Sequence, residues 1–155
     1  MDAYATFNQV LVHLFQEILD LEAKAIITDE FRDITNNDMH IIEAVGLGSG
    51  SNMSTIAKRL RITVGSLTTS MNQLVKKMYV FRERSEEDRR IVNISLTEKG
   101  VRAYEHHRDF HEQMTRAAMK ELTEEETGVL MRCLNSLSDF FHSYADKENE
   151  SKKPS

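Results

Sequence analysis

The chain has 155 residues, of which 40% are apolar and 29% charged, and its net charge is −5. Its apolar runs are only a few residues long, which excludes a membrane-spanning helix, and a single cysteine, Cys133, excludes an internal disulfide bond. No basic segment followed by an apolar one opens the chain, so we expect no signal peptide and a cytoplasmic protein. Cys133 itself is expected to be a buried structural residue.

The first predicted elements are helices. Apolar residues recur every three or four positions through residues 4–27, which indicates an amphipathic helix. Thr35 and Asp38 have the spacing of a capping box and predict the start of a second helix, for which Gly46 is a natural end. The following loop, GLGSGSN at residues 46–52, is rich in glycine and serine and is expected to be flexible.

Two short helices joined by a tight turn are predicted next. Ser54 is placed to cap a helix over residues 55–60, and Thr63 is placed to cap another over residues 64–77. The three residues between these helices, 61–63, leave room only for a turn. This order of elements is a helix-turn-helix.

A β-hairpin is predicted directly after the second of these helices. Residues 79–84 are rich in β-forming side chains, residues 85–89 are turn formers, and residues 90–96 alternate apolar side chains with others. A hairpin in this position forms the wing of a winged helix-turn-helix.

Two long helices complete the chain. Thr97 is expected to cap a helix that ends near Leu122, and Thr123 with Glu126 has the spacing of a further capping box, which opens the last helix. Residues 146–155 are polar and charged, and we expect them to form a disordered tail. The predicted fold is therefore mainly α with a small β-hairpin wing.

Charge is distributed unevenly over these elements. No aspartate or glutamate occurs between Ala44 and Phe81, although five lysines and arginines do. Residues 44–90 carry nine bases and four acids, a net charge of +5, so the rest of the chain carries −10. A local basic patch on an acidic protein indicates a nucleic-acid surface, although a short acid-free window can also arise by chance.

The polar face predicted for residues 64–77 suits the major groove of DNA, because short hydroxyls and amides can bond base edges or touch thymine methyl groups. We expect six residues to face that groove: Gly65, Ser66, Thr68, Thr69, Asn72 and Gln73. Six more are candidates for phosphate contacts, which fix the register on the duplex: Ser54, Lys58, Arg59, Lys76, Lys77 and Arg84. The alternative is a solvated amphipathic helix whose polar face has no partner.

The tip of the hairpin is expected to enter the minor groove. Arg89 and Arg90 can reach a narrow A·T tract, where negative potential is concentrated. Asp88 is placed to hold the guanidinium of Arg90 in one geometry before DNA arrives. The alternative is a surface cluster of ion pairs without function, each contributing about 0–1 kcal/mol.

Several of these segments resemble a known family. DRR at residues 88–90 and LTEKG at residues 96–100 are similar to the D-x-R and L-T-x-x-G signature of MarR-type winged-helix regulators. The stretches DMHIIEAVG, TVGSLTTSMNQL and RSEEDRRIVNISLTEKG resemble the FabT-type branch, which represses fatty-acid synthesis genes. The family usually has glycine where this chain has Met78, which predicts either a different helix end or a hairpin docked at a slightly altered angle.

The resemblance implies a single subunit over residues 1–145 that forms a homodimer on palindromic double-stranded DNA. Residues 4–34 and 97–145 would form a dimerisation lobe, and residues 35–96 would form the winged helix-turn-helix. It further implies a repressor of fatty-acid synthesis genes, with acyl carrier protein bearing a long acyl chain as corepressor. No membrane partner is implied.

Five residues are candidates for an effector cleft: His13, His40, His107, Arg108 and His111. His107 and His111 share one helix face, a spacing that also suits zinc, but no recognised metal motif accompanies them and we expect no metal. The chain has no phosphate loop and no nucleophile elbow, so we expect neither an enzyme nor a cofactor.

Two alternatives remain open at this point. A MarR-type regulator can instead be released from DNA by a small aromatic or phenolic ligand in the same cleft, or it can respond to zinc. A chain with these helices can also be an interaction module with no DNA role.

Overall fold

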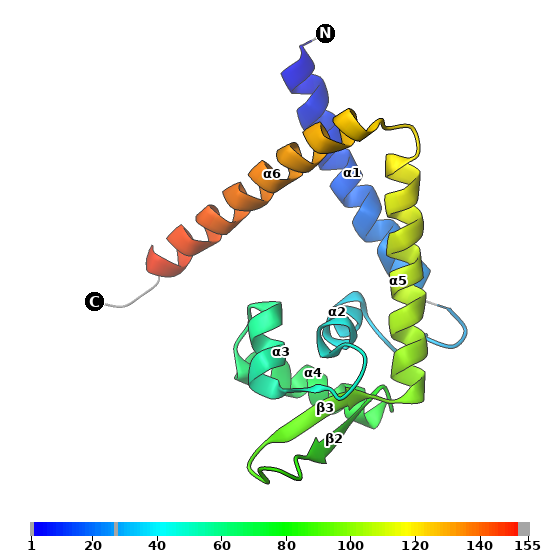
Figure 1. The fold of residues 1–155 in the computed structure, drawn as a ribbon, viewed down its shortest axis with the longest axis vertical. Coiled ribbons are helices and arrows are strands. Elements are labelled where there is room, and N and C mark those ends of the chain that lie inside the picture. Colours follow the sequence, from blue (N-terminus) through cyan, green and yellow to red (C-terminus); the bar gives the residue numbers. More distant parts are fainter. Residues whose placement is uncertain (1, 27, 152–155) are drawn as a thin grey trace. The chain divides into compact units, whose positions relative to one another are not determined.

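The computed structural model of the protein describes residues 2–26 and 28–151 (Figure 1). The chain divides into two compact units, residues 1–112 and residues 113–155. Within the described residues, none of the helices combines the length and the apolar character that crossing a bilayer requires.

The order of elements confirms the predicted mainly α fold with a small wing. Seven elements lie wholly within the first unit: α1 (Ala3–Ile26), α2 (Asn36–Val45), β1 (Ser51–Asn52), α3 (Met53–Leu60), α4 (Val64–Lys76), β2 (Val80–Arg84) and β3 (Val92–Leu96). Helix α5 (Glu98–Met119) begins in the first unit and ends in the second, and α6 (Glu124–Ser151) follows it.

The predicted caps of α2 and α4 are confirmed. The Thr35 hydroxyl accepts the Asp38 N–H at 3.2 Å, and the Asp38 carboxylate accepts the Thr35 N–H at 3.1 Å, which completes the capping box of α2. Helix α2 ends at Gly46, as expected. The Thr63 hydroxyl accepts the Ser66 N–H at 3.1 Å and begins α4. These signals are reliable because each depends on residues only three positions apart.

The segment before α3 differs from the prediction in two ways. Asn52, and not Ser54, caps α3, because its side-chain oxygen accepts the Thr55 N–H at 2.8 Å. The glycine-rich loop also ends in a short strand, β1, which pairs with β3. A Cβ on Gly50 would lie 2.1 Å from the carbonyl oxygen of Ile94, so this close approach of the loop to β3 requires glycine.

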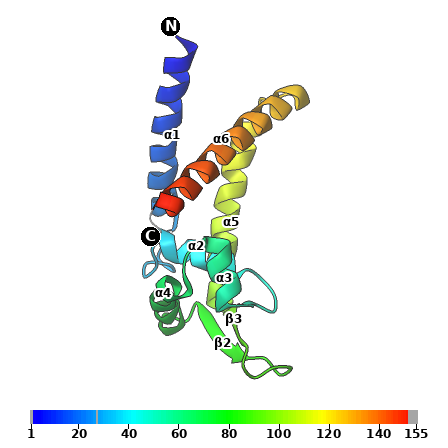
Figure 2. The same cartoon turned by 90° about the vertical axis from the view of Figure 1, so that its left-hand side faces the viewer.

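The three strands form one antiparallel sheet in the order β1-β3-β2. In the hairpin, Val80 lies opposite Leu96 and Arg84 lies opposite Val92. The hairpin extends away from α3 and α4 in both views of the first unit (Figures 1 and 2). This projecting hairpin is the predicted wing.

The hydrophobic core of the first unit determines which face of α4 is exposed to solvent. Leu67, Met71 and Leu74 are fully buried along one side of the helix. They pack with apolar side chains from α2, α3 and the sheet, such as Ile42 and Ile56. Because one stripe of α4 is anchored in this core, its opposite, polar stripe faces solvent.

Helix α4 ends with Met78 in the left-handed conformation, at φ 66°. The Met78 N–H donates to the Val75 carbonyl at 3.1 Å and the Tyr79 N–H donates to the Leu74 carbonyl at 3.0 Å, the two bonds of a Schellman motif. The helix therefore ends as it would with the family's glycine, although a side chain in this conformation costs about 1 kcal/mol.

The second unit contains the end of α5 and all of α6. The Thr123 N–H donates to the Glu126 carboxylate at 2.8 Å, and the Glu126 N–H donates to the Thr123 hydroxyl, so the predicted capping box is confirmed. Cys133 is exposed, which contradicts the expected burial, and none of the side chains described along α6 is buried. The helix continues to Ser151, into the predicted tail, and residues 152–155 lie outside the described residues.

Candidate nucleic-acid interface

The polar face of α4 is open to solvent at every position predicted to read the major groove. Gly65, Ser66, Thr68, Thr69, Asn72 and Gln73 are all exposed. Two of the hydroxyls make local bonds in the free protein. The Ser66 hydroxyl lies 2.8 Å from that of Thr63, and the Thr68 hydroxyl donates to the Val64 carbonyl at 2.8 Å. Both hydroxyl oxygens keep lone pairs that can accept from base amino groups.

The wing and the polar face of α4 lie next to each other. Arg82, on β2 of the wing, donates a hydrogen bond from its guanidinium to the side-chain oxygen of Asn72 on α4. The contact joins two of the elements expected to meet DNA and gives them a common surface. It also places the positive charge of the Arg82 guanidinium beside the amide of Asn72.

The wing tip is stabilised differently from the prediction. The Asp88 carboxylate accepts the backbone N–H of Arg90 at 3.0 Å, and the Ile91 N–H donates to the Asp88 carbonyl at 2.9 Å. Among the described residues, no ion pair joins Asp88 to the Arg90 guanidinium, because the short aspartate side chain closes on its own loop backbone. Asp88 therefore shapes the loop, and the side chains of Arg89 and Arg90 are exposed.

A shallow cleft of about 340 Å³ separates the wing from the start of α3. It is lined by Asn52, Met53, Ser54, Arg90, Ile91 and Val92. The first backbone N–H groups of a helix lack intrahelical partners and favour anions, and Arg90 adds a full positive charge. Ser54 and Arg90, predicted separately as phosphate and minor-groove contacts, thus meet at one cleft.

The six predicted phosphate contacts fall into two groups. Ser54, Lys58, Lys76 and Arg84 are exposed. Lys77 is half-buried, and its ammonium pairs with the Asp38 carboxylate at 3.2 Å. Arg59 is also exposed, and its guanidinium donates to the Ala44 carbonyl at 2.8 Å and to the Ser51 hydroxyl at 3.0 Å.

Lys77 and Arg59 therefore also hold the fold together, and their phosphate contacts stay predictions. Lys77 ties the end of α4 to the cap of α2, and Arg59 ties α3 to the end of α2 and to β1. Helical periodicity places a side chain on a face but does not reveal a partner on another element, and these partners are distant in sequence.

The predicted effector-cleft residues are only partly brought together. His107 and His111 lie side by side on α5, and the ring of His40 on α2 lies 6.0 Å from that of His107. His13 is exposed on α1. Arg108 is exposed and lies 3.7 Å and 3.8 Å from acids of its own helix. These last two residues do not join the group.

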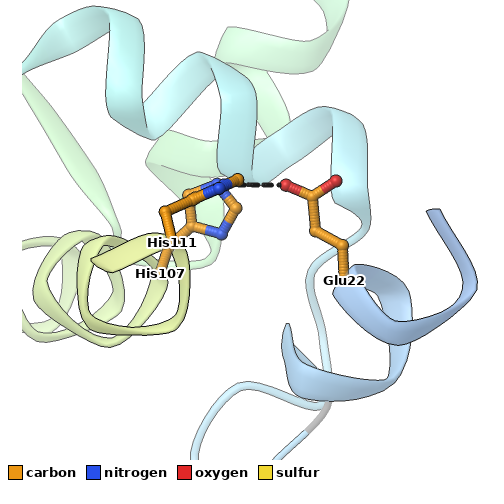
Figure 3. A group of neighbouring side chains, drawn as sticks. All are labelled: Glu22, His107 and His111. Atoms are coloured by element: carbon orange, nitrogen blue, oxygen red, sulfur yellow. Dashed lines mark hydrogen bonds and ion pairs between the residues drawn. The ribbon is translucent and has the colours of Figure 1, made fainter. Parts of the chain in front are cut away.

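Glu22 of α1 was missed by the sequence analysis. Its carboxylate lies 3.0 Å from the Nε2 atom of His111 (Figure 3). The signal was an acid at a core position of an amphipathic helix, since Ile18, Glu22 and Ile26 follow one another every fourth residue. A carboxylate at such a position requires a polar partner, which here comes from α5.

Comparison with known proteins agrees with this geometry. Residues 32–91 match the profile of the MarR family. Streptococcus pneumoniae FabT, whose crystal structure in complex with DNA is known, has 34% sequence identity to this chain. The likeness covers 91% of this chain and 99% of that one, with a TM-score of 0.81.

Two more distant proteins extend the comparison. The transcriptional regulator SarZ of Staphylococcus haemolyticus is 30% identical over 100 residues, which are 64% of this chain and 67% of that protein. The S. aureus MepR–DNA complex has the same fold, with a TM-score of 0.70 at 21% identity over 90% of this chain and 99% of that one. The protein described here belongs to the MarR family of winged helix-turn-helix transcriptional regulators.

Proposed function

We propose that this regulator represses transcription by binding an operator with α4 in the major groove and the wing in the adjacent minor groove. The observation that carries this proposal is the contact between Arg82 and Asn72, which joins the wing to the carboxylate-free face of α4. The 34% identity to FabT, which was crystallised with DNA, supports the same mode of binding. A duplex needs both elements on one surface, since a major groove lies beside a minor groove.

The proposed contacts divide by role. The exposed amides of Asn72 and Gln73 can each make two hydrogen bonds to an adenine edge. Gly65, Ser66, Thr68 and Thr69 complete the major-groove surface, and Arg89 and Arg90 enter the minor groove. Ser54, Lys58, Lys76 and Arg84 meet phosphates and position the protein without reading sequence.

We propose that the regulator is a homodimer, because both terminal helices expose large apolar side chains. On α1, Phe7, Val10 and Phe15 are about half exposed, and on α6 Phe140 and Phe141 are likewise half exposed. Exposed apolar surface of this extent usually marks an interface. Residues 4–34 and 97–145 would form the dimerisation lobe, and residues 35–96 would form the winged helix-turn-helix.

A two-fold dimer would require an operator of matching symmetry. The two copies of α4 would lie about 34 Å apart, so that each reads one half-site of a near-palindrome on the same side of the duplex. The exposed Cys133 lies on α6 and would then belong to the dimer lobe.

The regulated genes are proposed to be those of fatty-acid synthesis. The support is the identity to FabT over nearly its whole length, together with the shared segments around α2, α4 and the wing. The proposed corepressor is acyl carrier protein with a long acyl chain, which strengthens operator binding. A MarR-type regulator that a small aromatic ligand releases from DNA would instead bind its operator equally well with and without acylated carrier protein.

Fluorescence anisotropy with labelled promoter fragments tests the proposal. We expect fragments upstream of fatty-acid synthesis genes to bind more tightly than a scrambled duplex, and acylated carrier protein to tighten that binding further. Asn72→Ala should lose about 1–3 kcal/mol of operator affinity, whereas Asn37→Ala, at an exposed site on α2, should lose none. Equal affinity for promoter and scrambled DNA would contradict the proposed function.

A further inference from the structure

The wing restrains one of the two neighbouring amides on the polar face of α4. The Arg82 guanidinium on β2 donates to the Oδ1 atom of Asn72 at 2.5 Å. Both side chains are exposed, and neither has another hydrogen-bond or ion-pair partner in the part of the chain that the structure describes. Gln73, the next residue, is also exposed, and its side-chain amide makes no hydrogen bond to any described residue. The same chemical group is therefore held at one position and free at the next.

The fold fixes the backbone on both sides of this contact. Arg82 is the middle residue of β2, where it lies opposite Ile94 of β3, which is fully buried. Asn72 follows Met71, which is fully buried on the core side of α4. Because both backbones are anchored, the contact depends only on the rotation of two side chains, and it is already made before DNA arrives.

A guanidinium can orient an amide because it only donates hydrogen bonds. A side-chain amide has an accepting oxygen and a donating nitrogen, and a rotation by about 180° exchanges the two. Beside Arg82, the Asn72 amide keeps Oδ1 towards β2, since the exchanged orientation would set its Nδ2–H groups against those of the guanidinium. The charged donor also polarises the amide and makes its Nδ2–H groups stronger donors. Arg82 thus determines which way Asn72 presents its donor and its acceptor.

The orientation of an amide determines which purine it can bind in the major groove. Adenine presents the N7 acceptor beside the N6 amino donor, whereas guanine presents two acceptors, N7 and O6. With Nδ2 on N7 and the second lone pair of Oδ1 on N6, Asn72 makes two bonds to adenine. On guanine the same orientation sets Oδ1 against O6, so the amide must turn over to donate there. Turning over breaks the bond to Arg82, and guanine is therefore disfavoured.

We propose that Arg82 is a positioning residue that gives Asn72 its specificity, so that the base pair read by Asn72 is A·T in preference to G·C. The inference rests on the proposed function, because it requires α4 to lie in the major groove. It adds that one side chain of the wing controls sequence discrimination in the other groove. A chain without Arg82 would still bind DNA, but with weaker discrimination at that one base pair.

The base pairs read by the two amides are located first, with the full chain and the promoter duplexes that it binds. Each base pair of a bound duplex is replaced in turn, and affinity is measured by fluorescence anisotropy. The pair read by Asn72 is the one at which replacement weakens binding by the unaltered chain but not by Asn72→Ala. Gln73→Ala locates the pair read by Gln73 in the same way, and that pair is the internal control.

Discrimination at the Asn72 pair then tests the role of Arg82. We expect the unaltered chain to prefer A·T over G·C by about 10-fold or more, as a bidentate contact does. Arg82→Ala should reduce that preference to about threefold or less, because a turned amide keeps one bond to guanine. The preference at the Gln73 pair should not change. Arg82→Lys keeps a cation that only donates and should retain more of the preference than Arg82→Ala does.

Arg84 separates orientation of the amide from loss of charge. It is exposed on the same strand, and Arg84→Ala should weaken binding to the A·T and G·C duplexes equally, because a phosphate contact carries no sequence information. Nuclear magnetic resonance of the free protein follows the contact without DNA. The side-chain amide signals of Asn72 should shift in Arg82→Ala and stay in place in Arg84→Ala. Circular dichroism verifies that each variant is folded.

Three results would overturn the role of Arg82. They are an A·T preference that survives in Arg82→Ala, a loss of affinity in that variant that is equal for both duplexes, and the absence of any base pair that depends on Asn72. The proposed function fails in a different way, because no promoter fragment would then bind better than a scrambled duplex. The Asn72 signals would still respond to Arg82→Ala in that case, but the inferred specificity would fall with the function.

Discussion

Gly100 at the start of α5 lies directly against the carbonyl group of Tyr79 at the base of the wing. A Cβ on Gly100 would be 2.0 Å from the Tyr79 oxygen. The same oxygen accepts the Thr97 N–H at 3.0 Å, and the Thr97 hydroxyl accepts the Gly100 N–H at 3.1 Å. The L-T-x-x-G segment therefore caps α5 and also fixes the chain where α4 leads into the wing.

Replacing Gly100 should consequently destabilise the fold. Gly100→Ala would push the start of α5 away from the Tyr79 carbonyl and should lower the free energy of unfolding by about 2 kcal/mol or more. Gly128→Ala is the matched control, because its Cβ would meet only the end of the Arg132 side chain at 3.8 Å. That variant should be neutral or more stable by up to about 1 kcal/mol. Urea denaturation measures both, and equal effects would contradict the close approach.

The neighbouring lysines at the end of α4 should separate stability from DNA affinity. Lys77→Ala breaks the half-buried ion pair with Asp38 and should lower the free energy of unfolding by about 0.5–1 kcal/mol. Lys76→Ala, at an exposed site, should leave stability unchanged and should weaken binding to all DNA sequences.

The salt dependence of DNA affinity shows which of the two lysines contacts a phosphate. The plot of log affinity against log salt should become shallower by about one unit for Lys76→Ala. If Lys77→Ala changed that slope and Lys76→Ala did not, the assignment of the two lysines would be reversed.

The left-handed Met78 is a site of strain that can be relieved. Met78→Gly removes a cost of about 1 kcal/mol but makes the unfolded chain more flexible. Because the side chain is 65% exposed, little packing is lost, and we expect a net gain of about 0.5 kcal/mol. Met78→Ala keeps the strain and should change little. Chemical denaturation that finds Met78→Gly less stable than the unaltered protein would contradict this account.

Local signals explain which parts of the fold could be predicted from sequence. The caps at Thr35, Thr63 and Thr123 were identified correctly because each involves residues three positions apart. Strand β1 was missed because it pairs with β3, some forty residues later, and its own sequence is typical of a loop. The cap of α3 was misplaced by two residues, since asparagine and serine are both good caps and occur close together there.

The candidate sites show the same difference between local patterns, which sequence reveals, and contacts between distant residues, which it does not. The exposed face of α4 followed from helical periodicity, so every residue predicted to read the major groove is exposed. The partner of Lys77 and the place of Glu22 beside His111 depend on contacts 39 and 89 residues apart in sequence. Periodicity within one helix cannot determine such contacts, because they arise only when the helices pack.

The contact between Tyr79 and Asp33 predicts a pH dependence of stability. The Tyr79 hydroxyl donates to the Asp33 carboxylate at 2.6 Å. Burial raises the pKa of Asp33, but the bond from Tyr79 and the charge of Lys99 outweigh it, so that the pKa lies below its ordinary value. Stability from such a carboxylate is present above its unfolded pKa of about 3.9 and is lost as the pH falls through the lower folded value.

Tyr79→Phe should therefore lower the free energy of unfolding by about 1 kcal/mol near pH 7 and by less near pH 3. Tyr104→Phe, on α5, is a control for loss of a tyrosine hydroxyl and should show no such pH dependence. Urea titrations at the two pH values compare the variants, and an equal loss from Tyr79→Phe at both would be inconsistent with the lowered pKa.

Operator affinity of Arg90→Ala tests the central claim most directly, because Arg90 lies at the exposed wing tip and lines the cleft beside α3. If α4 and the wing together bind DNA, Arg90→Ala should lose about 1–3 kcal/mol of operator affinity while the protein stays folded. Arg32→Ala, an exposed arginine paired with Asp29, should bind as the unaltered protein does. Unchanged operator affinity in Arg90→Ala would contradict the account.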